Sequence, residues 1–168
     1  AGASMVSANL GGTIARNADF TSANLTGANF YAAKLDGAKF NFADLDGTEF
    51  NLASLEGAFF WEAKLKTARF AGAKWGNNYM LGDEKQSYVW AEQTYKSLKL
   101  WHRAALLDDI AGEFRYRELW SRKKAQNELL KASVRNHSPG AIVGARSRAV
   151  PLTFADILFG YGERWKRI

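Results

Sequence analysis

The chain has 168 residues, of which 47% are hydrophobic, and carries 23 Lys and Arg against 17 Asp and Glu, a net charge of +6. This apolar content is enough for a folded interior. The absence of cysteine excludes a disulfide framework, a thiolate metal site and thiol redox catalysis, and it fits a reducing compartment such as the cytoplasm.

The charge is unevenly distributed. Residues 1–77 carry 7 basic and 7 acidic side chains, whereas residues 78–168 carry 16 and 10. The basic half is a candidate for contact with phosphate or anionic lipid, or else is a solvated basic helix. No apolar run approaches the roughly 20 residues that span a bilayer. The start lacks both a signal-peptide pattern and an initiator Met, so we expect a soluble piece of a longer protein.

A period of five residues organises the first half. Fifteen units from Ala3 onward place a small residue, usually Ala, two residues before a central residue that is almost always large and apolar, as in Ala23-Asn24-Leu25. Residues five apart in a helix are rotated by about 140°, which excludes an amphipathic helix. Two apolar positions in one short extended segment share a side, and the remaining residues must turn the chain. The pattern therefore predicts a solenoid.

These units, such as Ala43-Asp44-Leu45-Asp46-Gly47, resemble the A(D/N)Lxx signature of the pentapeptide-repeat family over residues 3–77. The resemblance implies a right-handed quadrilateral β-helix with four units, or twenty residues, in each coil. We predict a fold of the β-solenoid plus α class. About four such coils over residues 1–80 are followed by an α-helical hairpin and a short C-terminal helix. Glycine often ends a unit, where a tight corner favours it.

A twenty-residue coil stacks each residue on the one twenty positions later, which predicts the packing of the core. The expected internal ladders are Phe20, Phe40 and Phe60; Phe30, Phe50 and Phe70 opposite them; Leu25, Leu45 and Leu65; and Leu35 with Leu55. Outside the coils the same rule predicts exposed ion pairs between Asp44 and Lys64, Asp46 and Lys66, and Glu49 and Arg69.

Two large apolar residues should point outward from the column. Phe59 and Trp61 flank the inward Phe60, so their side chains need cover. We expect the following helices to pack over them, and the alternative is that they form a candidate surface for a protein partner or for self-association.

Helical spacing of apolar residues begins after residue 80. A helix is expected from Ser87 to about Ala105 and a second from about Asp108 to Ser133, forming an antiparallel hairpin over residues 81–134. Glu113 with Arg117, and Glu118 with Arg122, lie at i, i+4, which indicates a solvated face. Residues 135–151 are expected to be a linker. Residues 152–168 are expected to form an amphipathic, juxtamembrane segment.

The second half also shows a more particular resemblance. The runs 92–99, 111–118 and 159–164 are similar to segments of pentapeptide-repeat proteins that continue into membrane-spanning helices, some of them ion-channel-like. In that group the last run is typically followed by Pro, whereas Trp165 stands here. Basic side chains next to a tryptophan are typical of the cytoplasmic edge of a bilayer. The candidate membrane-proximal residues are Arg164, Trp165, Lys166 and Arg167, and an ordinary basic C-terminus is the alternative.

Catalytic chemistry is not indicated. His102, on a helix, and His137, in a loop, are far apart, and no metal-ligand, nucleophile or phosphate-binding motif occurs. The acidic pairs Asp83-Glu84 and Asp108-Asp109 fall where helices should begin, which favours capping. We therefore expect no enzyme activity, cofactor, metal or small-molecule substrate.

Three functions remain open. The first is a scaffold or regulatory domain of a channel-like membrane protein, in the cytoplasm and extending to the inner face of the membrane. The second is a DNA mimic that acts on DNA gyrase, as the resemblance implies for some members; the zero net charge of residues 1–77 argues against it. The third is direct binding of nucleic acid by the basic helices.

Overall fold

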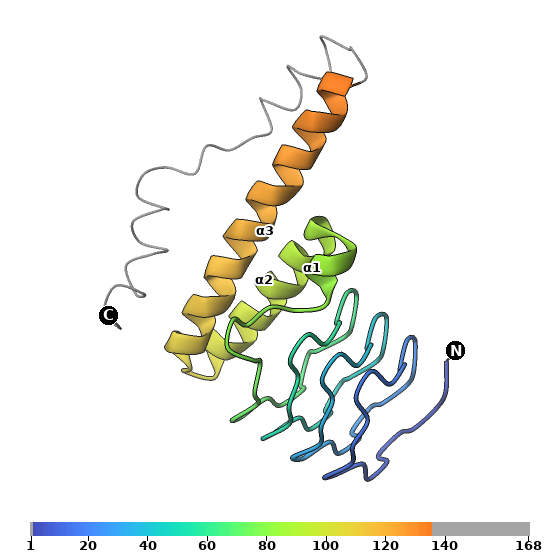
Figure 1. The fold of residues 1–168 in the computed structure, drawn as a ribbon. Coiled ribbons are helices and arrows are strands. Elements are labelled where there is room, and N and C mark those ends of the chain that lie inside the picture. Colours follow the sequence, from blue (N-terminus) through green and yellow to red (C-terminus); the bar gives the residue numbers. More distant parts are fainter. Residues whose placement is uncertain (1, 136–168) are drawn as a thin grey trace.

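The structure is a computed structural model that describes residues 2–135. The predicted C-terminal segment, the membrane-proximal candidates at residues 164–167, His137 and nearly all of the predicted linker lie outside the described residues. Within residues 2–135 a column of stacked coils is followed by three helices, which lie against the last coils (Figure 1). These are α1 (Asp83–Gln86), α2 (Tyr88–Ala104) and α3 (Asp108–Arg135).

The column repeats every twenty residues. Parallel bridges join each outward residue to the one twenty positions later, from Ser4 with Asn24 to Ser54 with Lys74. Backbone hydrogen bonds run in the same register; for example, the amide of Phe40 donates to the carbonyl of Phe59 at 2.8 Å. Within the described residues each bridge is isolated, and the bridges do not join into extended strands, because the chain turns after every few residues. The twenty-residue coil that the resemblance implies is therefore present in the column.

The corners of the coils adopt the left-handed backbone conformation. Gly27 and Gly47 have φ of 67° and 70°, as expected for residues without a Cβ. Phe42 and Leu52, each with φ of 60°, occupy equivalent corners. A non-glycine residue in this conformation costs about 1–2 kcal/mol. The stacking register therefore overrides the local preference wherever a unit does not end in glycine.

Two phenylalanine ladders fill the interior, as predicted. Phe40 stacks on Phe20 and on Phe60 at 5.2 Å, with nearly parallel rings. Phe50 stacks on Phe30 at 5.3 Å and on Phe70 at 5.2 Å. The two ladders meet edge to face, an arrangement that aromatic quadrupoles favour.

The helices extend this core beyond the last coil. The Trp75 ring meets Phe114 of α3 at 5.1 Å, and Phe70 meets Trp101 of α2 at 5.2 Å. In Figure 1 α2 and α3 run side by side across the green end of the column. The antiparallel hairpin is thus confirmed. The acid pair Asp83-Glu84 indicated a helix start, and α1 begins there, but its end at Gln86 as a separate short helix was not expected.

The prediction of a solvated hairpin face was wrong. Glu118 is 5% exposed and pairs with Lys99 of α2 as well as with Arg122. Arg117 does not pair with Glu113. It forms an ion pair with the carboxylate of Glu84 and donates a hydrogen bond to the carbonyl of Asn78 instead. The i, i+4 pattern indicated which charges share a face, but that face packs against α2 and the end of the column.

One of the three predicted ion pairs on the column forms. Lys64 Nζ lies 2.9 Å from Asp44. The Asp46 carboxylate accepts instead from the amide and hydroxyl of Thr67, and Glu49 accepts from the Asn51 amide. Nearby corner groups satisfy these carboxylates, and holding a long, flexible cation in one geometry would cost side-chain entropy.

Candidate interaction site

The last coil of a solenoid exposes an edge of backbone donors and acceptors, and here the helical part satisfies several of them. The amide of Gly82 donates to the carbonyl of Ala58 at 2.9 Å. The indole of Trp101 donates to the carbonyl of Ala68 at 2.6 Å. The helical part thus hydrogen-bonds to the edge at Ala58 and at Ala68. It covers part of an edge that would otherwise be open to pairing with another chain.

The carboxylate of Asp83 completes this connection. It accepts from the amides of Phe60 at 3.0 Å and Trp61 at 3.2 Å, and the side chain is fully buried. Asp83 does begin a helix, but its side chain accepts hydrogen bonds from the coil and not from that helix. No side chain caps the N-terminus of α1. The capping interpretation was therefore wrong for Asp83.

Burial perturbs the acids at this junction. It raises the pKa of Asp83 from 3.8 to about 6, against the lowering effect of the amides of Phe60 and Trp61. Burial also raises the pKa of Glu84, whose carboxylate accepts from the hydroxyl of Tyr95 and lies 3.5 Å from Arg117. The carboxyl groups of Asp83 and Glu84 therefore lose their protons at a higher pH than exposed acids do.

Asp83 should make stability depend on pH. Because its folded pKa lies above its unfolded value, its contribution is fully present below pH 3.8 and is lost as pH rises through 6, a change of about 3 kcal/mol. We expect the unfolding free energy of the wild type, relative to Asp83→Asn, to fall as pH rises from 4 to 7. Urea unfolding at several pH values measures this difference, in which the titration of Glu84 and His102 cancels. A difference that is constant or rises with pH would contradict the assignment.

An outward aromatic stack lies beside this junction. Trp61 stacks on Trp90 of α2, with ring centroids 3.9 Å apart, and meets Phe42 of the coil below at 4.6 Å. Phe42 remains 49% exposed, and both tryptophans are half-buried. We call Phe42, Trp61 and Trp90 the aromatic stack. One side of Trp61 is thus covered from within the chain, and its role as a partner surface stays a prediction.

Phe59 lies apart from the aromatic stack. A Cβ built on Gly82 would lie 2.4 Å from its ring, so Phe59 packs directly under the start of α1. Phe59 also lines a hollow of about 600 Å³ together with charges of both signs, including Arg16, Glu56 and Lys85. The two residues singled out together from the sequence therefore face different surroundings.

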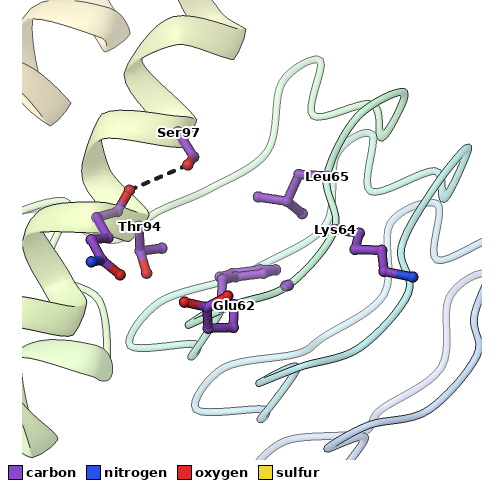
Figure 2. Close-up of a pocket in the computed structure, with 8 residues that line it drawn as sticks. Glu62, Lys64, Leu65, Thr94 and Ser97 are labelled. Atoms are coloured by element: carbon purple, nitrogen blue, oxygen red, sulfur yellow. Dashed lines mark hydrogen bonds between the residues drawn. The ribbon is translucent and has the colours of Figure 1, made fainter.

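A groove of about 250 Å³ separates the last coil from α2 (Figure 2). Residues 60 and 62–65 form one wall, and Gln93, Thr94 and Ser97 form the other. Leu65 lies in the groove, whereas the amino group of Lys64 points away from α2 (Figure 2). The hydroxyls of Thr94 and Ser97 donate to carbonyls of their own helix, at Trp90 and Gln93. The groove thus offers polar and apolar contacts but no nucleophile paired with a base.

The helical histidine belongs to the core. His102 is fully buried, its Nδ1 lies 2.8 Å from the Leu98 carbonyl, and burial lowers its pKa. It lies among Phe70, Trp101 and Phe114. Over residues 2–135, no three His, Asp or Glu side chains are grouped so that they could hold a metal ion. None of the helices in that part of the chain is long and apolar enough to cross a membrane.

Comparisons with known proteins identify the repeats. A family model described as pentapeptide repeats, in eight copies, matches residues 3–41 and 33–72. A pentapeptide repeat protein from the cyanobacterium Cyanothece 51142 is similar in structure, with a TM-score of 0.43 and 25% identity, over 45% of this chain and 51% of that one.

A pentapeptide repeat protein from the Arabidopsis thaliana thylakoid lumen has a TM-score of 0.30 and 33% identity, over 42% of this chain and 52% of that one. The present chain therefore spans about half the length of each of these structures. No curated protein sequence matches.

Proposed function

We propose that this chain, whose residues 3–72 are pentapeptide repeats, is a non-catalytic interaction module that binds a protein partner at the aromatic stack. We also propose that its column of coils is a right-handed quadrilateral β-helix of about four coils. The observation that carries the proposal is the exposed ring of Phe42 against Trp61 and Trp90.

The stack has the properties of an anchoring surface. Aromatic residues, and Trp above all, dominate the affinity of protein interfaces when they are rigid and become fully covered on binding. Trp61 is held by Trp90 on one side, and its backbone amide is held by Asp83. Trp61 therefore has little conformational freedom to lose when a partner covers the stack, which favours affinity.

A matched pair of variants tests this function. Phe42 and Leu52 are both corner residues with φ of 60°, and they are 49% and 47% exposed. We expect Phe42→Lys to reduce capture of the partner from a lysate of the source cells by at least about tenfold, since interface anchors contribute about 2 kcal/mol or more. Leu52→Lys should capture as well as the wild type. Equal capture by the two variants, or no protein retained by the wild type, would refute the proposal. Sedimentation velocity shows whether the partner is a second copy.

We further propose that this interaction module lies at the inner face of a membrane, as part of a channel-like protein. It is supported by the resemblance of runs 92–99, 111–118 and 159–164 and by the basic and aromatic residues 164–167. Basic residues contribute about 1 kcal/mol each at an anionic surface. We expect the full chain to cosediment with phosphatidylserine vesicles at low salt, and replacement of Arg164, Lys166 and Arg167 by Ser to abolish this. A wild type that does not cosediment would remove membrane proximity from the proposal, and unchanged cosedimentation of the variant would remove these three residues from it.

A further inference from the structure

Four rows of outward residues run along the column, each joined from coil to coil by parallel bridges. Three of these rows place an acid one coil below a base, namely Asp19 below Lys39, Asp44 below Lys64, and Glu49 below Arg69. The fourth row consists of Ile14, Lys34, Ser54 and Lys74. We call it the lysine row, because over residues 2–80 it is the row that carries basic side chains and no acid.

The two lysines of this row have no acidic partner. Both are exposed, and neither forms an ion pair within residues 2–135. They line a hollow of about 200 Å³, in which the one acid is Asp36. The carboxylate of Asp36 is already engaged, because it accepts from Arg16 Nε at 3.1 Å and from the hydroxyl of Ser54. Lys34 and Lys74 are therefore available to the carboxylates of another molecule.

The spacing of the two lysines fits an α-helix. Successive residues of a row lie one coil apart, about 4.8 Å, so Lys34 and Lys74 are separated by about 10 Å. Residues i and i+7 of a helix share one face and lie about 10.5 Å apart along its axis. Residues of a strand that share a face lie about 7 or 13 Å apart instead. A helix that lies along the column can therefore place one carboxylate on each lysine.

Ile14 adds an apolar contact at the end of the row. It is the most exposed large apolar side chain over residues 2–80, at 69%, and it lies one coil below Lys34. We propose that the lysine row binds an acidic amphipathic helix of a protein partner. An apolar residue of this helix covers Ile14, an acid four residues later pairs with Lys34, and an acid seven residues after that pairs with Lys74. The helix runs from Ile14 towards Lys74, since the partial negative charge of a helix C-terminus is attracted to the lysines.

The neighbouring rows favour a narrow partner over a nucleic acid. They carry Glu49 on one side of the lysine row and Asp19 on the other. A duplex is wider than a helix and charged on every side, so it would bring phosphates close to these acids, and residues 1–77 carry no net charge to attract it. A helix can contact the lysine row alone. The row shares no residue with the aromatic stack, so it is a second surface beside the one proposed above.

Binding of a designed peptide to the full chain tests this surface. The probe is a fluorescent, end-capped helical peptide of about 18 residues, rich in alanine and glutamine, with one leucine and two glutamates at the spacing given above. We expect Lys34→Gln with Lys74→Gln to raise its Kd at least about fivefold, through the loss of two ion pairs. The control is Lys66→Gln with Arg69→Gln, which removes the same charge from two exposed positions outside the row and should change Kd less than about twofold. Equal effects of the two double variants, or no binding to the wild type, would overturn the proposal.

A second peptide tests the geometry of the contact. It has the same composition, but its second glutamate follows the first by nine residues and so lies on the opposite face of the helix. We expect fluorescence anisotropy to show that it binds the wild type at least about threefold more weakly than the first peptide. Equal affinity for the two peptides, or tighter binding of duplex DNA through the same two lysines, would contradict the proposal. Phe42→Lys should bind the first peptide as the wild type does, so this proposal and the proposed function can fail separately.

Discussion

Phe40→Ala is expected to lower the free energy of unfolding by about 3–5 kcal/mol, the range for a buried phenylalanine whose cavity cannot collapse. The ring of Phe40 is stacked between Phe20 and Phe60 and meets the edges of Phe30 and Phe50. These neighbours are held at the coil spacing by backbone hydrogen bonds and cannot move in to fill the space. Urea unfolding followed by circular dichroism measures the change.

Phe42→Ala is the matched control for this experiment. It removes the same side chain two residues further along, where the ring is 49% exposed and, among the aromatic rings of residues 2–135, meets only Trp61. We expect a loss of about 1 kcal/mol or less, which corresponds to one exposed aromatic pair. Equal losses for the two variants would show that Phe40 does not belong to an internal ladder.

Gly82→Ala is expected to separate the hairpin from the column at a cost of about 3 kcal/mol, at the upper end of the usual range for overpacking. A Cβ at residue 82 would lie 2.4 Å from two carbons of the Phe59 ring and 2.5 Å from the carbonyl oxygen of Gly57. The backbone oxygen cannot rotate aside. The backbone of Gly82 has φ of −61°, which any residue adopts, so the effect is steric and not conformational.

Gly11→Ala provides the comparison for Gly82. Its closest contact to an added Cβ would be 3.3 Å, to the side-chain oxygen of Asn9, which can shift by a few tenths of an ångström more easily than backbone. Its unfolding free energy should stay within about 0.5 kcal/mol of the wild type, as for most surface substitutions. If Gly82→Ala is as stable as Gly11→Ala, then α1 does not contact the last coil in the way described.

The column could be predicted in detail because its register follows from counting. Once four units make a coil, every residue stacks on the one twenty positions later, so the partners of Phe40 and of Asp44 are read from the sequence. The corners were less predictable. Phe42 takes a backbone conformation that its own preferences oppose, because the neighbouring coils impose it.

The junction could not be predicted in the same way. The acid pair Asp83-Glu84 looks like a helix start, and only the packing of α1 on the coil brings Asp83 to the amides of Phe60 and Trp61. Likewise, the spacing of Glu118 and Arg122 is the same for an exposed and a buried pair. The burial of Glu118 depends on which face of α3 meets α2.

One of the three residues of the aromatic stack was predicted from the sequence. The alternation of inward and outward residues places Trp61 on the outside, and the structure puts it in the aromatic stack. Phe42 could have been found by the same alternation, since it occupies the corner one coil below residue 62. Trp90 could not, because its contact with Trp61 depends on how α2 crosses the column.

The central claim is that the hairpin closes the last coil through Asp83, so that coil and helices form one body. Native-state hydrogen exchange tests it most directly, at the amides of Phe60 and Trp61. We predict that both amides open with about the same free energy as the Phe40 amide inside the column, because coil and hairpin unfold together. Fast, fraying exchange at Phe60 and Trp61, with Phe40 still protected, would contradict the claim.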